Sequence, residues 1–228
     1  AVLNHGNLPV MEVAAFCAAC EWRIGLAVAP VWPEFRGMRL RAVPAGSRED
    51  ADEIPPALVP SATVANTLGV HGVAGGKPYG TVELDMCEQY RVPWTNAAWH
   101  EAVEIGGNPE LSITVATPDG KRWPRELVDF VTANLTTFEG VVLGSAVTPA
   151  FFDPNAPAGG PFDLDDTVTG PLARIGIPPG GWSGWQNPDG SYASAYGDAV
   201  PPNLRGYIDG RKGRFWRWAQ TIPPIRRL

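Results

Sequence analysis

The segment 94–105 is the feature that most constrains how this chain folds, because its pattern predicts one central amphipathic helix. Thr95 or Asn96 can cap the start of the helix, and a Gly-Gly pair followed by Pro109 gives a strong stop. Both ends of the helix are therefore well marked, and the rest of the chain is expected to pack around it.

Glycine and proline limit long helices elsewhere. The sequence contains 26 glycines and 24 prolines, together 50 of its 228 residues, which favours short elements joined by turns. A second helix is predicted over 8–23, a strand over 80–86, and a β-hairpin around the turn 187–190. With 44% hydrophobic and 18% charged residues, the composition is that of a folded globular protein.

Within the central helix, His100 and Glu104 are four residues apart and project from one face. An imidazole and a carboxylate placed in this way can hold two corners of a metal site. Glu101 points elsewhere and could remove a proton from a metal-bound water, as in the zinc-peptidase helix H-E-x-x-H, here with Glu in place of the second His. The alternative is an ordinary helix whose carboxylates face water and whose His100 is half-buried.

Three blocks of the sequence, 99–109, 126–131 and 145–154, follow one another with the spacing of a known family pattern. The chain resembles a zincin-like (HExxE) protein family of tailed phages and prophages over about residues 20–195. The resemblance implies an α+β fold, with a zincin-like mixed or antiparallel sheet over the central helix. A loop-rich β C-terminal part and a basic tail complete the expected fold.

The chain departs from the family pattern at three positions. Asn108 stands where the family has Asp, Val128 replaces a Cys, and Trp99 replaces a small residue. These changes leave the three polar residues of the helix in place, but they alter the residues expected around the site.

The resemblance also implies a third metal ligand after the helix, for which Glu126 and Asp129 match family positions. The segment 126–131 is expected to be a short strand or extended, so that a spacing of three points the two carboxylates to opposite faces. Asp129 is preferred, Glu126 is the alternative, and His71, in a predicted loop, ranks below both. The expected ion is Zn²⁺, although one His with two carboxylates also suits Mn²⁺ or Ca²⁺.

The chain is expected to have three parts. Residues 1–160 form the zincin-like domain, 161–204 a Gly/Pro-rich hairpin extension of the same domain, and 205–228 a basic aromatic C-terminal arm. The arm has seven basic residues and one acid, a net charge of +6. Because the whole chain has a net charge of −6, residues 1–204 carry −12.

Aromatic residues among the arginines favour docking of the arm over a solvated tail that only balances the acidic body. The expected partners are other subunits of a protein assembly, a phage virion, in preference to nucleic acid. The expected contact residues are Phe215, Trp216, Trp218, Arg211, Arg214 and Arg217.

No window reaches the roughly eighteen apolar residues of a membrane span, and the start lacks the basic region of a secretory signal. The expected location is therefore the virion or the host cytoplasm. Three cysteines cannot all pair within one chain. Cys17 and Cys20 are expected to pack on a helix rather than to bind zinc.

Two functions remain from different classes. The first is a metal-dependent peptidase in which Glu101 is the catalytic base. The second is a purely structural capsid or tail protein of the virion, a decoration or connector protein whose zincin-like site is vestigial.

Overall fold

The structure, a computed structural model, describes residues 2–4, 8–44, 56–59 and 68–205 of the 228-residue chain. Its described part combines helices with parallel and antiparallel strands, which confirms the α+β class. The C-terminal arm beyond Arg205, with all six of its predicted contact residues, lies outside the described residues. The zincin-like assignment and the division into three parts stay predictions.

A five-stranded mixed sheet lies beside the central helix, with its strands in the order β2-β1-β3-β5-β4. Four strands are parallel, and the edge strand β4 runs antiparallel to β5, with His71 opposite Gly80. The strands are β1 (Val2–Asn4), β2 (Ala42–Pro44), β3 (Pro56–Val59), β4 (Gly69–Ala74) and β5 (Lys77–Glu83).

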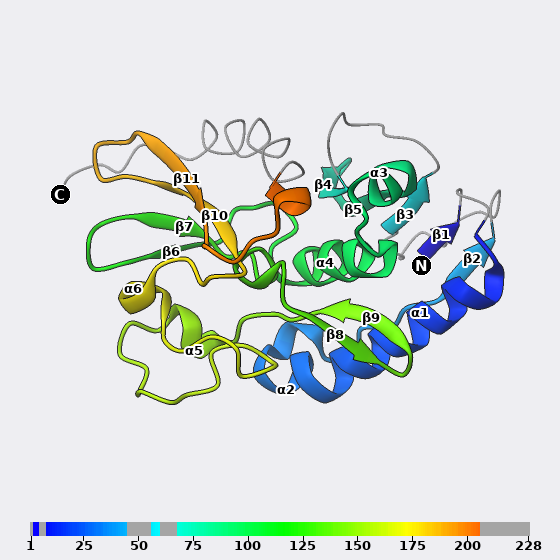
Figure 1. Cartoon of the computed structure of the whole chain (residues 1–228), viewed down its shortest axis with the longest axis horizontal. Helices are drawn as coiled ribbons and strands as arrows, with labels where there is room; N and C mark the ends of the chain where they lie inside the picture. Colours follow the sequence, from blue (N-terminus) through cyan, green and yellow to red (C-terminus); the bar gives the residue numbers. More distant parts are fainter. Residues whose placement is uncertain (1, 5–7, 45–55, 60–67, 206–228) are drawn as a thin grey trace.

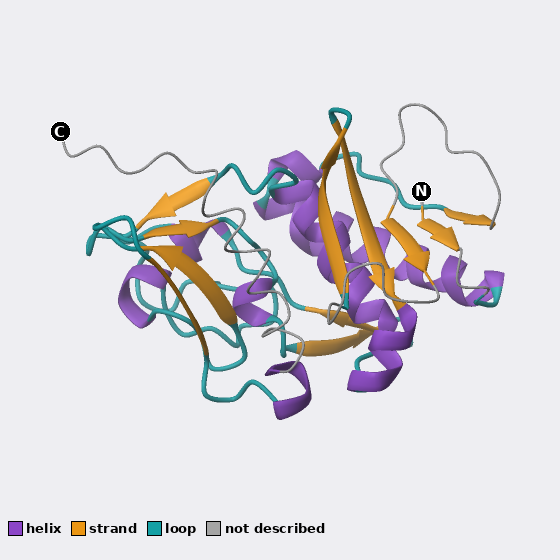
Figure 2. Ribbon diagram, turned by 90° about the horizontal axis from the view of Figure 1, so that it is seen from above, coloured by secondary structure: helices purple, strands orange, loops and turns teal. Residues whose placement is uncertain are grey.

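A four-stranded antiparallel sheet, β11-β10-β7-β6, lies at the opposite end of the molecule (Figure 2). Its β10–β11 pair confirms the predicted hairpin. A separate two-stranded sheet is formed by β8 and β9. The strands are β6 (Thr114–Ala116), β7 (Arg122–Pro124), β8 (Leu135–Phe138), β9 (Val141–Gly144), β10 (Trp182–Gln186) and β11 (Tyr192–Tyr196).

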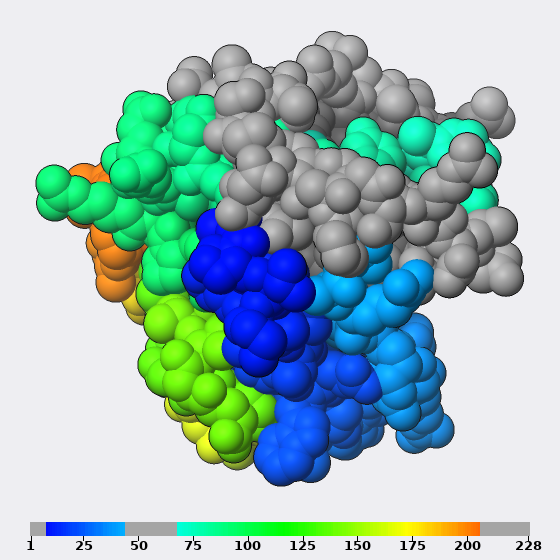
Figure 3. All heavy atoms as spheres, turned by 90° about the vertical axis from the view of Figure 1, so that its right-hand side faces the viewer, coloured from blue at the N-terminus to red at the C-terminus, as the bar shows by residue number. Residues whose placement is uncertain are grey.

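The N-terminal helix α1 (Val10–Arg23) confirms the helix predicted over 8–23. It continues through a π-helix and a short α-helix, and this stretch lies beside the β8–β9 segment (Figure 3). The remaining helices are short. The helical elements other than α1 and the central helix are η1 (Ile24–Val28), α2 (Ala29–Val31), η2 (Pro33–Phe35), α3 (Leu84–Tyr90), η3 (Asp129–Val131), α5 (Pro149–Phe152) and α6 (Leu172–Ile175).

The expectation that no segment is long and apolar enough to span a membrane is corrected by this N-terminal stretch. Val10–Val31 is one helical run of 22 residues with a mean hydropathy of 1.4, enough by length and composition alone. Of its apolar window, 44% is buried within the fold. A helix in the core of a folded domain can be equally long and apolar, because apolar side chains are favoured both in a protein core and in lipid.

The central helix α4 (Trp94–Gly107) forms as predicted, but its ends differ. Pro93 occupies the N-cap position, and no side chain caps the start. Thr95 instead donates its hydroxyl to the carbonyl of Val142 at 2.6 Å. The Gly-Gly pair, expected to stop the helix, lies in its last turn. Glycine is required there because a Cβ at either position would press on the side chain of Phe35 or Leu127.

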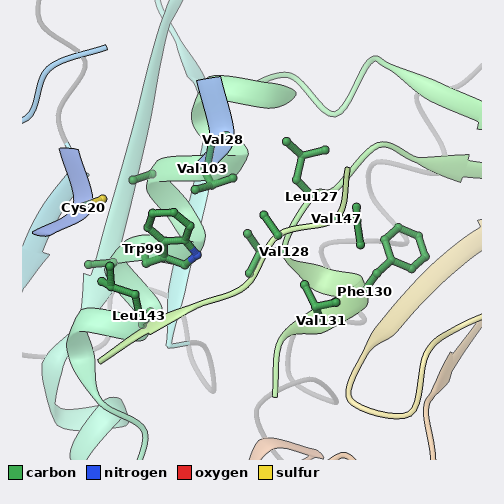
Figure 4. Close-up of a cluster of buried hydrophobic side chains, with 14 of the residues drawn as sticks. Cys20, Val28, Trp99, Val103, Leu127, Val128, Phe130, Val131, Leu143 and Val147 are labelled. Atoms are coloured by element: carbon green, nitrogen blue, oxygen red, sulfur yellow. The ribbon is translucent and has the colours of Figure 1, made fainter. Parts of the chain in front are cut away.

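The packing of α4 explains why it is buried on every side. It lies between the five-stranded sheet and the β8–β9 sheet (Figure 1), so every residue from 96 to 105 is buried. Trp99 and Val103 face the hydrophobic cluster with Cys20 and Leu143 (Figure 4). The Trp99 indole donates to the carbonyl of Ser145 at 3.3 Å, so this departure from the family pattern belongs to the core.

The strand predicted over 80–86 begins and ends three residues earlier, as β5 (Lys77–Glu83). β5 ends at Glu83, and the next residue begins α3. Before that point β5 lies against α4, since a Cβ on Gly80 would come within 2.8 Å of the Ile105 side chain. β5 and its neighbour β4 are therefore both in contact with the central helix.

We expect Gly181→Ala to destabilise the fold strongly. A Cβ at this position would overlap the backbone of Phe130, and neither backbone can move aside easily. Overpacking of this kind costs about 1–3 kcal/mol or more. Urea unfolding followed by tryptophan fluorescence measures the loss. The matched control is Gly25→Ala, where no atom lies within 4 Å of the added Cβ. Its free energy of unfolding should be unchanged or about 0.5–1 kcal/mol higher, and equal stability of both variants would contradict the expectation.

Candidate metal centre

The first part of the centre comes from α4, where His100 and Glu104 project from one face as their spacing predicts. His100 Nε2 lies 2.8 Å from Glu104 Oε1. Both side chains are buried. Their ligand atoms therefore face the same point in the protein interior.

Asp129 completes a group of three with this pair. Its Oδ1 lies 3.2 Å from His100 Nε2, and the ligand atoms of the three residues all lie within 4.8 Å of one another. Around a tetrahedral ion with bonds of about 2.1 Å, ligand atoms stand about 3.4 Å apart. The structure thus brings together the three ligands preferred from the sequence, with separations of 2.8 and 3.2 Å that would widen slightly around a bound ion.

The segment that carries Asp129 is not the predicted strand. Residues 126–131 form a turn that runs into the 3-10 helix η3. Residues three apart in such a turn lie on the same side, so Glu126 and Asp129 both reach the centre instead of opposite faces. The apolar residues between and after them fill the core cluster (Figure 4). These are Leu127, Val128, Phe130 and Val131.

Residues outside the ligand set hold His100 and Asp129 in place. The Trp182 indole N–H donates to Asp129 Oδ1 at 2.8 Å, and Thr132 Oγ1 lies 3.5 Å from His100 Nδ1. Trp182 begins β10, directly after Gly181, the glycine that lets this strand approach η3. The β10–β11 hairpin therefore positions a metal ligand.

His71, the residue ranked lowest from the sequence, lies at the centre of a second group. Its Nδ1 lies 3.0 Å from Glu101 Oε2 and 3.2 Å from Glu104 Oε2. These three residues also have ligand atoms within 4.8 Å of one another. His71 lies on β4 and not in a loop. The sequence of this strand, Gly-Val-His-Gly-Val-Ala, has no apolar–polar alternation that would have indicated it.

Glu126 joins the centre beside His71 and not beside His100. Its Oε2 lies 3.7 Å from His71 Nε2, and Asn108 donates from Nδ2 to its Oε1 at 3.3 Å. Asn108 also bonds the backbone of Ile113 in both directions. The amide that replaces the family's Asp thus provides an N–H for Glu126, which an ionised Asp could not do.

The centre as a whole could hold a metal ion. Its six ionisable side chains are between 0% and 5% exposed. Buried carboxylates are costly unless positive charge compensates them, and imidazole and carboxylate are the ligands of Zn²⁺, Mn²⁺ and related ions. The six residues are His71, His100, Glu101, Glu104, Glu126 and Asp129.

The cysteines take no part in this centre. Cys17, Cys20 and Cys87 are buried and free. Burial raises the pKa of Cys17 and of Cys87 to about 12 and raises the pKa of Cys20 as well. All three therefore stay protonated thiols at neutral pH, which suits packed residues and not metal ligands.

We expect Trp182→Phe to lower the affinity for a divalent metal about 10–100-fold while the fold is kept, because a hydrogen bond to a ligand tunes its position and basicity. Competition with a chromophoric chelator measures the affinity. Trp185→Phe is the matched control, since the Trp185 indole donates to Asn187 within the same hairpin. Equal affinities of the two variants would show that Trp182 does not support the site.

Comparisons of the whole chain with protein-family models, with curated proteins and with solved structures give no match.

Proposed function

We propose that this protein is a divalent-metal-dependent peptidase whose ion is held by His100, Glu104 and Asp129. The observation that carries the proposal is the convergence of His100 Nε2 with Glu104 Oε1 at 2.8 Å and with Asp129 Oδ1 at 3.2 Å. Two of the ligands come from α4, and the third, Asp129, comes from η3, 25 residues after Glu104. Their meeting in the interior is a tertiary feature, not a local accident of sequence.

Zn²⁺ is the ion that we propose. Zinc takes four ligands, and catalytic zinc sites commonly supply three from the protein. One His and two carboxylates would balance the charge of the ion. When bound, the ion would polarise a substrate carbonyl and lower the pKa of a water molecule.

Glu101 is the proposed base. It follows His100 directly, and its Oε2 lies 3.0 Å from His71 Nδ1. The His71 ring would hold the Glu101 carboxylate in orientation. Glu101 would then accept the proton of the attacking water, as the equivalent Glu does in H-E-x-x-H sites.

A peptide substrate is supported by the position of β4. This strand, which carries His71, is an edge of the five-stranded sheet in the described part of the chain. An extended peptide can add to such an edge through main-chain hydrogen bonds. That alignment would bring its carbonyl groups past the centre.

A structural ion is the second candidate, and the burial of the ligands favours it. Side chains that are at most 5% exposed are typical of closed sites that stabilise a fold. In this case the protein would be the structural capsid or tail component that the resemblance to phage proteins also allows. Metal occupancy together with turnover separates the two candidates.

We expect the purified protein to bind zinc and to cleave labelled casein in a chelator-sensitive way. His100→Ala should lose the ion at this position. Glu101→Gln should keep that ion and lose at least about 100-fold in turnover, since a general base contributes roughly 10²–10⁴-fold. Elemental analysis and a fluorescence assay give the two measurements.

Glu110→Gln is the control for this experiment, because it removes an exposed carboxylate after the helix. It should match the wild type in both measurements. Full zinc occupancy with no cleavage by any form would favour the structural ion. Unchanged turnover in Glu101→Gln would place the base elsewhere.

Docking of the C-terminal arm on a neighbouring virion subunit is a separate proposal, supported by its composition. The arm has a net charge of +6, the rest of the chain has a net charge of −12, and the arm contains Phe215, Trp216 and Trp218. Burial of such aromatics is favourable by about 25 cal/mol per Å², whereas exposed ion pairs contribute about 0–1 kcal/mol each.

We expect deletion of 205–228 to abolish assembly with the partner, measured by sedimentation or by incorporation into particles. Assembly through the aromatics should weaken only modestly between 50 and 200 mM salt, while binding to nucleic acid through several arginines would fall by orders of magnitude. Unchanged assembly after the deletion would show that the arm is only a tail.

A further inference from the structure

We propose that the centre binds a second divalent cation between His71, Glu101 and Glu104, so that Glu104 bridges two ions. The inference rests on the proposed function, since it takes the ion at His100, Glu104 and Asp129 as the first of the pair. The second ion would have His71 of β4 as a ligand, in addition to two carboxylates of the helix motif.

The two oxygens of Glu104 carry the argument. Oε1 lies 2.8 Å from His100 Nε2, whereas Oε2 lies 3.2 Å from His71 Nδ1. The carboxylate therefore presents one oxygen to each group of ligands. A carboxylate shared in this way is how two ions are held about 3.5–4 Å apart in dinuclear hydrolases.

The second group has the spacing of a metal site in its own right. His71 Nδ1 lies 3.0 Å from Glu101 Oε2, and the three ligand atoms fall within 4.8 Å of one another. Both distances from His71 Nδ1 are close to the separation of about 3.4 Å between neighbouring ligands of a tetrahedral ion. An ion could enter with small movements of side chains that are already in place. Glu101 Oε2 would then be a ligand of this ion, and the other carboxylate oxygen, Oε1, would accept the proton of the attacking water.

The surroundings of His71 are those of a metal-bound histidine. When one ring nitrogen binds a metal, the other usually donates to a carboxylate, a backbone carbonyl or a water molecule that fixes the ring. His71 Nε2 faces Glu126 at 3.7 Å, and Glu126 is held by Asn108. This parallels His100, whose Nδ1 faces Thr132.

The backbone of β4 and β5 is shaped around Glu101. A Cβ on Gly69 would lie 2.7 Å from Glu101 Oε1, and one on Gly80 would lie 3.6 Å from Glu101 Cβ. Larger residues at Gly69 would displace the carboxylate from His71. Glycine at this position thus keeps the second group of ligands intact.

Charge balance among the described residues also favours two ions. The centre contains four carboxylates and two imidazoles, all buried. With neutral imidazoles as ligands, one divalent ion would leave a charge of about −2 in the interior, and a second would bring it to about zero. The carboxylates are Glu101, Glu104, Glu126 and Asp129.

The test is metal stoichiometry of the full chain, loaded with Mn²⁺ or Zn²⁺, dialysed and measured by elemental analysis. Wild type should hold about two equivalents, and His71→Asn should hold about one. The Mn²⁺ form should give an exchange-coupled EPR spectrum, which His71→Asn should convert to that of an isolated ion. If His71→Asn does not fold, Glu101→Gln, nearly the same shape, should show the same loss.

The outcomes separate this inference from the proposed function. One equivalent in the wild type, unchanged in His71→Asn and Glu101→Gln but lost in His100→Ala, would overturn the second ion and leave the first. No bound metal in any form would overturn both. Glu110→Gln serves again as the control and should keep about two equivalents.

Discussion

Four carboxylates and two imidazoles share one buried volume beside α4, and the fold has to compensate the repulsion between those carboxylates. In a low-dielectric interior, an uncompensated charge costs several kcal/mol even after relaxation. The ring nitrogens lie between the carboxylates. His71 Nδ1 is within 3.2 Å of both Glu101 and Glu104, and His100 Nε2 within 3.2 Å of both Glu104 and Asp129. Cations bound in the same volume would complete that compensation.

Close approach of backbone segments is what brings these side chains together. β4 reaches Glu101 because Gly69 has no side chain, and β10 reaches η3 because Gly181 has none. The first approach positions His71 and the second positions Trp182 against Asp129. Glycine, whose abundance limits long helices in this chain, therefore also allows the backbone segments around the centre to approach one another.

Local patterns predicted α1, α4 and the β10–β11 hairpin, because spacing and turn residues are sufficient signals for each. The spacing of four likewise placed His100 and Glu104 on one face. The pattern of apolar residues over 126–131 could not distinguish a strand from a 3-10 turn, since a segment buried on several sides is apolar in either conformation.

His71 shows the limit of sequence reasoning at this site. Its place in the centre depends on the pairing of β4 with β5 and on the packing of both against α4, which are contacts between distant parts of the chain. The side-chain support from Trp182, more than fifty residues after Asp129, was hidden for the same reason. Nothing in the local sequence around either residue indicates these partners.

Ligands from β4, α4 and η3 are far apart in the sequence, so an ion bound among them would link elements that the unfolded chain does not hold together. Its binding free energy would then stabilise the native state. Stabilisation by metal is therefore expected of a catalytic and of a structural centre alike. The two kinds of centre differ in whether an ion with three protein ligands keeps a coordination position that a substrate can reach. Such a substrate would lie beside β4, the edge strand that carries His71.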